Sequence, residues 1–185
     1  NFRNGYTHDY SSNSGISITI EANMPEIIPL PPERNEEARM VIYAVAHQLF
    51  DSNLTFDEAT EIYRKEWPIH DLDDPRRSYF ENGGTFFVVI EKGEIIGTGA
   101  LRRMEEGVGE IKRLWLLPAY HGQGLGYQVM ARLLAEARQR GYAKVRLATS
   151  PKYQVRAYQF YRQLGFYEIP RYNDDPDDVG MELVL

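Results

Sequence analysis

The sequence has no cysteine, only four histidines, and no apolar run as long as the roughly 18 residues that a membrane-spanning helix requires. The missing cysteine excludes disulfides, cysteine-based zinc sites and any mechanism that passes through a cysteine acyl-enzyme. Because the histidines are widely spaced, we expect no metal site. A net charge of −6 argues against general nucleic-acid binding, which needs basic surface to displace counterions. We therefore expect neither a nucleic-acid nor a membrane partner.

The composition indicates a globular protein with one hydrophobic core. The chain has 185 residues, of which 43% are hydrophobic and 26% are charged. Residues 1–15 are polar and lack the basic start and apolar stretch of a signal peptide, so they predict a loosely held tail. We expect residues 16–185 to form a single domain and the protein to be cytoplasmic.

Hydrophobic patterning in the N-terminal half predicts mostly helix. The expected segments are a strand at 16–20, an extended proline-rich connector at 25–32, a helix at 33–50, a helix at 55–67 and a turn-rich stretch at 70–84. Thr55 and Glu58 have the spacing of a capping box at the start of the second helix. Pro68 ends that helix.

The C-terminal half predicts strands alternating with helices. The expected strands are 86–90, 95–101, 110–117, 143–148, 166–169 and 179–185, and the expected helices are 122–140 and 151–164. Ser150 is the predicted cap of the last helix, with Pro151 in its first position. A helix pair, an antiparallel meander and a β-α-β-α-β order together predict a mixed α/β (α+β) fold.

A glycine-rich turn, His121 to Gly126, joins a predicted strand to a predicted helix. Glycines let backbone N–H groups approach a ligand, and a helix N-terminus favours an anion such as a pyrophosphate. The turn fails the dinucleotide-binding pattern, whose third glycine falls at Tyr127, and it has no Lys-Ser or Lys-Thr of a phosphate-binding P-loop. A glycine-rich turn without a ligand stays open as an alternative, although each glycine costs a helix about 1 kcal/mol relative to alanine.

Residues 86–170 resemble the GNAT superfamily of acetyl-CoA-dependent acyltransferases. The superfamily signature is Arg or Gln, two residues, Gly, one residue, then Gly or Ala, and it maps onto His121, Gly124 and Gly126. His121 replaces the usual Arg or Gln. The stretch 114–118 looks like the family's fourth strand and the proline after it. The resemblance implies a largely antiparallel sheet of six to seven strands flanked by helices, with splayed fourth and fifth strands.

The same resemblance implies acetyl-CoA as co-substrate, with its pantetheine arm between the splayed strands. The backbone N–H of Leu114 would polarise the thioester carbonyl, as donors in an oxyanion hole do. The cofactor-binding residues that the resemblance implies are Leu114, Leu116, His121, Gly122, Gln123, Gly124, Leu125, Gly126 and Gln154.

Two side chains are the candidate catalytic groups. The stretch 157–166 resembles the family motif in which a tyrosine, here Tyr161, protonates the departing thiolate. Glu110 matches a position that some members use as general base. In a regular strand it would share a face with Leu114, about 13 Å away at ~3.3 Å per residue, and would act through water. A solvated Glu and a packing Tyr are the alternatives.

These features predict direct transfer of an acetyl group to a primary amine of a small molecule or peptide. Acidic loops would attract a cationic amine, or are simply solvated; their residues are Asp71, Asp73, Asp74, Asp174, Asp175, Asp177 and Asp178. The aromatic residues Tyr63, Trp67, Tyr79 and Tyr172 either line the acceptor pocket or pack in the core. The alternatives are a coenzyme-A-binding sensor or interaction module without turnover, which His121 favours, and a structural protein. A homodimer remains one option.

Overall fold

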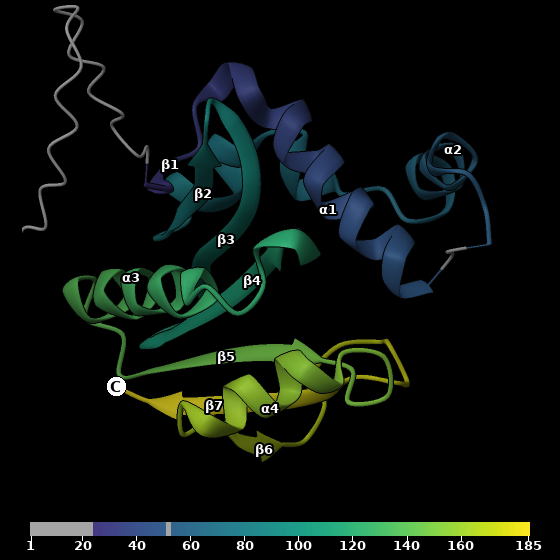
Figure 1. Cartoon of the computed structure of the whole chain (residues 1–185). Coiled ribbons are helices and arrows are strands. Elements are labelled where there is room, and N and C mark those ends of the chain that lie inside the picture. Colours follow the sequence, from purple (N-terminus) through teal and green to yellow (C-terminus); the bar gives the residue numbers. More distant parts are fainter. Residues whose placement is uncertain (1–23, 51–52) are drawn as a thin grey trace, which may run out of the picture.

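The computed structural model describes residues 24–50 and 53–185 of the chain. Seven strands form one sheet in the order β1-β2-β3-β4-β5-β7-β6 (Figure 1). All neighbouring strands are antiparallel except β4 and β5, which are parallel. This architecture confirms the predicted mixed, largely antiparallel fold.

The elements follow the predicted order. The strands are β1 (Glu26–Pro29), β2 (Thr85–Glu91), β3 (Glu94–Glu105), β4 (Val108–Leu116), β5 (Lys144–Thr149), β6 (Tyr167–Ile169) and β7 (Val179–Val184). The helices are α1 (Asn35–Phe50), α2 (Phe56–Glu66), α3 (Leu125–Gln139) and α4 (Val155–Gln163). Short helical turns are η1 (Pro32–Arg34), η2 (His70–Leu72), η3 (Arg76–Phe80) and η4 (Pro118–Tyr120).

Two predictions about local structure were wrong, and a third lies outside the described residues. The proline-rich segment 25–32 is not only a connector, because Glu26–Pro29 pairs with β2 at the edge of the sheet, where proline is tolerated. The last helix does not start at Pro151 under a Ser150 cap. It starts at Val155, because residues 151–153 form a turn first. The strand predicted at 16–20 falls among the residues not described.

The capping box of α2 is confirmed. The Thr55 hydroxyl accepts a hydrogen bond from the Glu58 backbone N–H at 3.3 Å, and the Glu58 carboxylate accepts one from the Thr55 backbone N–H at 2.9 Å. Both bonds satisfy amides that a helix start leaves unpaired. The sequence pattern therefore placed this helix start to within a residue.

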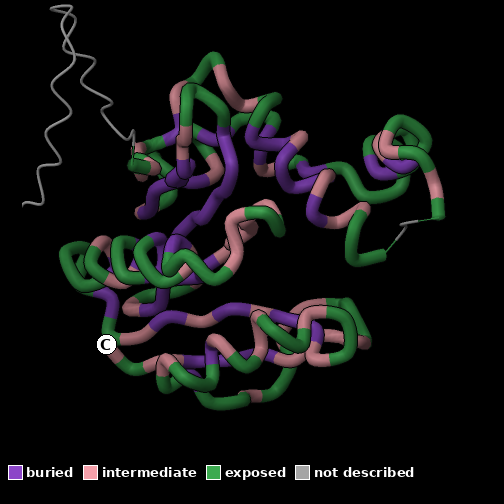
Figure 2. Tube along the Cα trace, in the orientation of Figure 1, coloured by how far each residue is buried: buried purple, intermediate pink, exposed green. Residues whose placement is uncertain are grey.

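Each face of the sheet is covered by its own pair of helices and its own apolar cluster. Helices α3 and α4 cover one face, and their cluster includes Met130, Leu133 and Phe166. Helices α1 and α2 cover the other, around Tyr43, Tyr63 and Phe86. Buried residues accordingly follow the central strands and the inner faces of the helices (Figure 2). The two clusters pack against opposite faces of the strands that carry the candidate site.

Candidate active site

The two parallel strands β4 and β5 pair only where they begin. Their ladder joins Val108 to Lys144, Gly109 to Val145 and Glu110 to Arg146, and then stops. Beyond that point β5 continues to pair with β7 on its other side, while β4 continues to pair with β3. Figure 1 shows β4 and β5 diverging toward their carboxyl ends. The predicted splay of the fourth and fifth strands is therefore present.

A β-bulge at Arg113 interrupts β4 beside this opening. Lys112 pairs with Ala100 and Trp115 pairs with Thr98, so β4 has one residue more than β3 between these pairs. Arg113 has a φ of 54°, in the left-handed region that non-glycine residues rarely adopt. The Thr98 hydroxyl donates to the Arg113 carbonyl oxygen at 2.6 Å and helps to hold this conformation.

The bulge overturns one expectation about Glu110. Because an extra residue reverses the alternation of side chains, Glu110 and Trp115 share one face of the sheet, and Leu114 lies on the other. The packing agrees: Leu114 contacts the cluster under α3, and Trp115 contacts the cluster under α1 and α2. The prediction that Glu110 and Leu114 share a face was therefore wrong, since it assumed a regular strand.

A cavity of about 720 Å³ lies at the open end of the splayed strands. This volume is within the range of roughly 300–1,000 Å³ that small-molecule sites occupy. The described residues that line it come from the glycine turn, β4, the end of α1 and the start of α4, and most are apolar. Of the residues predicted to bind cofactor or catalyse, those on its wall are Leu114, Leu116, His121, Gly122, Gly124, Leu125, Gly126, Gln154 and Tyr161.

The glycine turn presents unused backbone donors to this cavity. Gly122 and Gly124 have φ values of 81° and 78°, which explains why glycine occupies these two positions. Within the described part of the chain, the backbone N–H groups of residues 122–126 donate to no carbonyl or side chain. A Cβ added to Gly126 would meet no atom within 4 Å. The turn is therefore an open cradle at a helix N-terminus, suited to an anion.

Both ring nitrogens of His121 make hydrogen bonds within the protein. Its Nε2 lies 2.8 Å from the Leu116 carbonyl oxygen, so this nitrogen carries the proton and donates. Its Nδ1 then accepts from the Arg156 guanidinium at 3.4 Å. Arg156 lines the same cavity and has no carboxylate partner among the described residues. A positive charge that the sequence pattern did not reveal thus lies next to the glycine turn.

Tyr161 is buried on α4, with 7% of its surface exposed, and it lines the cavity. Its hydroxyl makes no hydrogen bond to any described residue, and burial raises the pKa of its phenol well above the usual value. The phenol is therefore protonated at neutral pH and keeps a proton available to donate.

Gln154 lines the cavity but uses its side chain internally. Its Oε1 accepts from the Thr149 hydroxyl at 2.8 Å and from the Ser150 backbone N–H at 3.3 Å. Gln154 itself, rather than Ser150, is the residue that precedes the first turn of α4. Its side chain thereby links the end of β5 to the start of α4, and only its amide N–H donors remain without a partner among the described residues.

Glu110 and Gln123 do not line the cavity. The Glu110 carboxylate is bound by Arg102 at 2.7 Å and lies 3.8 Å from the Lys112 ammonium group. Gln123 donates from its side chain to the Ala119 carbonyl oxygen at 3.3 Å. The structure therefore does not bring the proposed base next to Tyr161, although Glu110 marks the last rung of the ladder before the strands part.

A partly buried ion pair anchors the bulge. The Arg113 guanidinium donates to both oxygens of Asp71, at 2.7 Å and 3.0 Å, and the Tyr79 hydroxyl donates to the same carboxylate. Burial alone would raise the pKa of Asp71, but the hydrogen bonds and charge of Arg113 outweigh it and lower that pKa to about 2. The loop before β2 thereby holds the strand segment that contains Leu114.

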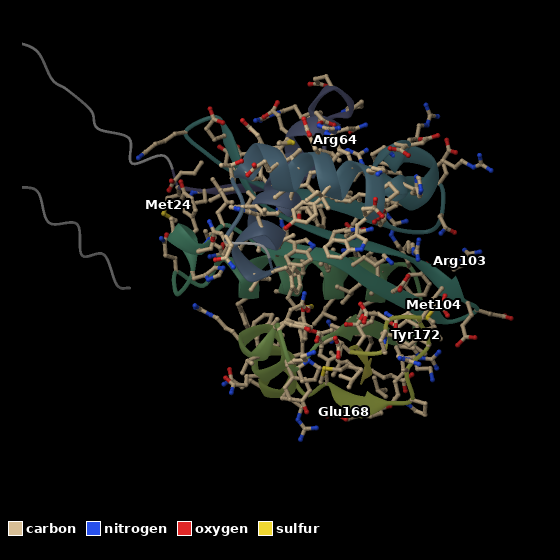
Figure 3. The ribbon with its side chains drawn as sticks, turned by 90° about the vertical axis from the view of Figure 1, so that its right-hand side faces the viewer. Met24, Arg64, Arg103, Met104, Glu168 and Tyr172 are labelled. Carbon is tan, nitrogen blue, oxygen red and sulfur yellow. The ribbon has the colours of Figure 1, made fainter. Side chains whose placement is uncertain are left out.

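The predicted acidic mouth does not line the cavity, and several of its carboxylates are paired. Asp71 binds Arg113, Asp73 binds Arg39, and Asp177 binds Lys152. Of the four aromatic candidates, Tyr63 and Tyr79 are core residues, and Trp67 is exposed. Tyr172 lies in the β6–β7 connection (Figure 3), with a buried hydroxyl that has no partner among the described residues.

Sequence reasoning missed further residues on the cavity wall, among them Val45 and Leu49 of α1, Trp115, and Tyr153. Helical periodicity assigned Val45 and Leu49 to the core side of α1. Trp115 was overlooked because the bulge, not the strand pattern, turns it toward α1. No local signal in the sequence marks Tyr153.

The sequence model of the acetyltransferase (GNAT) family matches residues 53–166, more than half of the chain. The chain therefore belongs to the GNAT family of acetyltransferases. It is 36% identical over 95 residues to an uncharacterised N-acetyltransferase of Mycobacterium bovis, an alignment that covers 51% of this chain and 56% of that protein. It is 33% identical over 104 residues to the IAA acetyltransferase of Azospirillum brasilense, covering 54% and 67%. The chain thus spans about half the length of the mycobacterial relative.

Solved structures support the fold independently. PaiA N-acetyltransferase of Thermoplasma acidophilum, solved with coenzyme A, superposes with a TM-score of 0.72 at 20% identity, over 88% of this chain and 99% of that one. A GNAT-family acetyltransferase of Staphylococcus aureus gives 0.69 at 20% identity, over 87% and 99%. At this identity the likeness concerns the fold.

Two findings concern other ligands and surfaces. Across residues 24–50 and 53–185, no three His, Asp or Glu side chains gather as a metal-binding group. None of the helices in those residues combines the length and apolar character needed to cross a membrane.

Proposed function

We propose that the protein transfers an acetyl group from acetyl-CoA directly to a primary amine of a small molecule or peptide. One observation carries the proposal: a single cavity combines unpaired backbone amides at a helix start, a strand edge released from its ladder, and a buried, protonated tyrosine. The neighbours solved with coenzyme A and with acetyl-CoA support the choice of co-substrate.

In this proposal the glycine turn holds the pyrophosphate. The amides of residues 122–126 donate to phosphate oxygens, and the helix N-terminus adds roughly half a positive charge. Arg156 supplies the full charge that His121 lacks. The pantetheine arm then follows the free edge of β4 past Leu116 to Leu114, which has no ladder partner.

The chemistry requires one bond to form and one to break. The amine nitrogen bonds to the acetyl carbon, the carbon–sulfur bond breaks, and the sulfur leaves as a thiolate. The Leu114 backbone N–H stabilises the charge that develops on the carbonyl oxygen. Tyr161 donates its proton to the thiolate, giving free coenzyme A. No cysteine is present to form an acyl-enzyme, so transfer occurs within one ternary complex.

Glu110 is proposed to take the amine proton through water. The bulge places it on the same face of the sheet as Trp115, toward α1 and α2, whereas Tyr161 acts from the α4 side. Base and acid therefore act from opposite faces of the sheet, with the thioester between them.

The direct test is to mix the purified protein with acetyl-CoA and a panel of primary amines and to measure free thiol. Thiol release that depends on the amine supports the proposal. An acetylated enzyme that accumulates without acceptor in a single turnover would contradict direct transfer.

The variant Gly126→Val tests whether the cofactor phosphates bind at the glycine turn. The added side chain enters the space above the amide cradle, so we expect the Kd for coenzyme A to rise at least tenfold. The melting temperature should not fall, because a Cβ at this position meets no protein atom within 4 Å and valine costs a helix less than glycine does. Unchanged affinity would place the phosphates elsewhere.

A coenzyme-A-binding module without turnover is the second candidate. The observation that favours it is that His121 is bonded to Leu116 and Arg156 rather than free for a ligand. Saturable coenzyme A binding without thiol release for any amine would establish this alternative.

A further inference from the structure

A row of aromatic rings forms one wall beside the acceptor end of the cavity. Tyr153, between β5 and α4, lines the cavity. The Phe50 ring, at the end of α1, meets it edge-on at 5.3 Å between ring centroids, and the Trp67 ring, at the end of α2, meets Phe50 edge-on at 6.5 Å. Trp67 also stacks on the buried Tyr63 at 5.6 Å, which anchors the row to the core.

These rings are exposed although they touch one another. Trp67 is 58% exposed, Tyr153 40% and Phe50 39%. Leu49 and Trp115 continue the apolar surface into the cavity. Contiguous apolar surface of this kind is characteristic of binding sites, because covering it with a ligand removes apolar area from water, which is favourable.

The charges around the cavity limit what the ligand can be. No Asp or Glu is among the described residues that line it. The nearby carboxylates of Asp71 and Asp177 already bind Arg113 and Lys152. The Lys152 ammonium group also lies 4.5 Å from the centre of the Tyr153 ring, so a cation already occupies this side of the wall. Among the described residues that line the cavity, a second ammonium group on the ligand would find no carboxylate.

We infer that the acceptor is a small primary amine with one aromatic or branched apolar body and no second positive charge. This inference rests on the proposed function. The apolar body packs against Phe50, Trp67 and Tyr153, which places the amine nitrogen near Trp115 and the thioester. Polyamines and lysine-rich peptides are poor substrates because the described residues of the cavity lining offer a second ammonium group no carboxylate.

The first test compares two amines at saturating acetyl-CoA. We expect kcat/KM for 2-phenylethylamine to exceed that for spermidine at least tenfold. Phe50→Ala should raise KM for 2-phenylethylamine about tenfold, because the phenyl ring of the substrate loses a packing partner. The same variant should leave KM for acetyl-CoA unchanged.

Phe80→Ala is the matched control. The exposed fraction of Phe80, 37%, is similar to that of Phe50, but Phe80 lies in η3 and is not part of the row of rings, so this variant should keep both KM values. Trp67→Ala repeats the test from a second helix. Turnover that favours spermidine, with no effect of Phe50→Ala or Trp67→Ala, would overturn the inference while leaving amine acetylation established.

A binding measurement separates this inference from the proposed function. Trp67 and Trp115 are the only tryptophans in the chain, and both lie at this wall, so tryptophan emission reports on it. In the coenzyme A complex, 2-phenylethylamine should shift the emission saturably, and Phe50→Ala should weaken this binding about tenfold. If no amine releases thiol, the acetyltransferase proposal fails. The saturable shift would then still support the apolar amine site, and its absence would overturn it.

Discussion

The two halves of β4 differ in their neighbours. Residues 108–110 are bonded to strands on both sides, whereas residues 113–116 pair with no strand except β3 and contain a bulge. In the first half, the strand pairs with both of its neighbours in the sheet. The second half leaves groups unpaired at the edge of a cavity, where a ligand can use them. A single strand thus serves stability where its ladder is complete and function where the ladder ends.

The largest effect on the functional half is expected from Tyr161→Phe. The ring stays in the core, but the only proton proposed for the departing thiolate is lost, so kcat should fall at least tenfold. Steady-state kinetics and coenzyme A titration would check this, with cofactor affinity expected to stay the same. An unchanged kcat would remove Tyr161 from the site.

Asp71→Asn tests the anchor that links the bulge to the rest of the fold. A pKa lowered from 3.8 to about 2 corresponds to about 2 kcal/mol of stability at neutral pH, which the variant should lose. Because the folded-state pKa is the lower one, the stabilisation is present above pH 4 and disappears as the pH falls toward 2. Denaturant unfolding of both proteins should therefore converge across that interval.

Asp73→Asn is the control for Asp71→Asn. Asp73 is in the same loop and is also paired with an arginine, but its side chain is 62% exposed, so the variant should cost clearly less stability than Asp71→Asn does. Equal losses from both variants would show that burial of the Asp71–Arg113 pair adds nothing.

Arg156→Gln tests the charge beside the glycine turn. We expect the Kd for coenzyme A to rise about tenfold, the size of a charge-assisted hydrogen bond. Binding of acetyl-pantetheine, which lacks the nucleotide phosphates, should not change. Arg162→Gln, on the same helix but away from the cavity lining, is the control. A similar loss in both variants, or for both ligands, would argue against a phosphate contact.

The smallest effect is expected at Glu110, which is the last residue of β4 that pairs with β5. If it acts as base through water, Glu110→Gln should lower kcat several-fold, with the loss greatest at low pH, where less of the amine is neutral. Arg102→Gln breaks the same ion pair from the other side and should lower the melting temperature without lowering kcat. Matching kinetic profiles for the two variants would assign Glu110 to stability alone.

Short-range patterns predicted much of the fold and part of the site. The capping box at Thr55, the glycine turn and the Tyr161 motif each depend on residues within a few positions of one another; the capping box is confirmed, and the glycine turn and Tyr161 both line the cavity. The start of α4 was missed because Ser150 and Pro151 have the pattern of a helix start. In the structure, the Gln154 side chain accepts a hydrogen bond from the Ser150 backbone N–H, and the helix begins after Gln154.

The sequence by itself determined the order of the elements from α1 onward, the family, and several of the residues that line the cavity, because local propensity and spacing encode these. Only the tertiary structure decided which face Glu110 occupies, since the bulge at Arg113 depends on pairing with β3 and on Asp71, 42 residues away. It also decided the contact of Arg156 with His121 and the meeting of Phe50, Trp67 and Tyr153. Such contacts arise where distant segments pack together, and no periodicity along the chain records them.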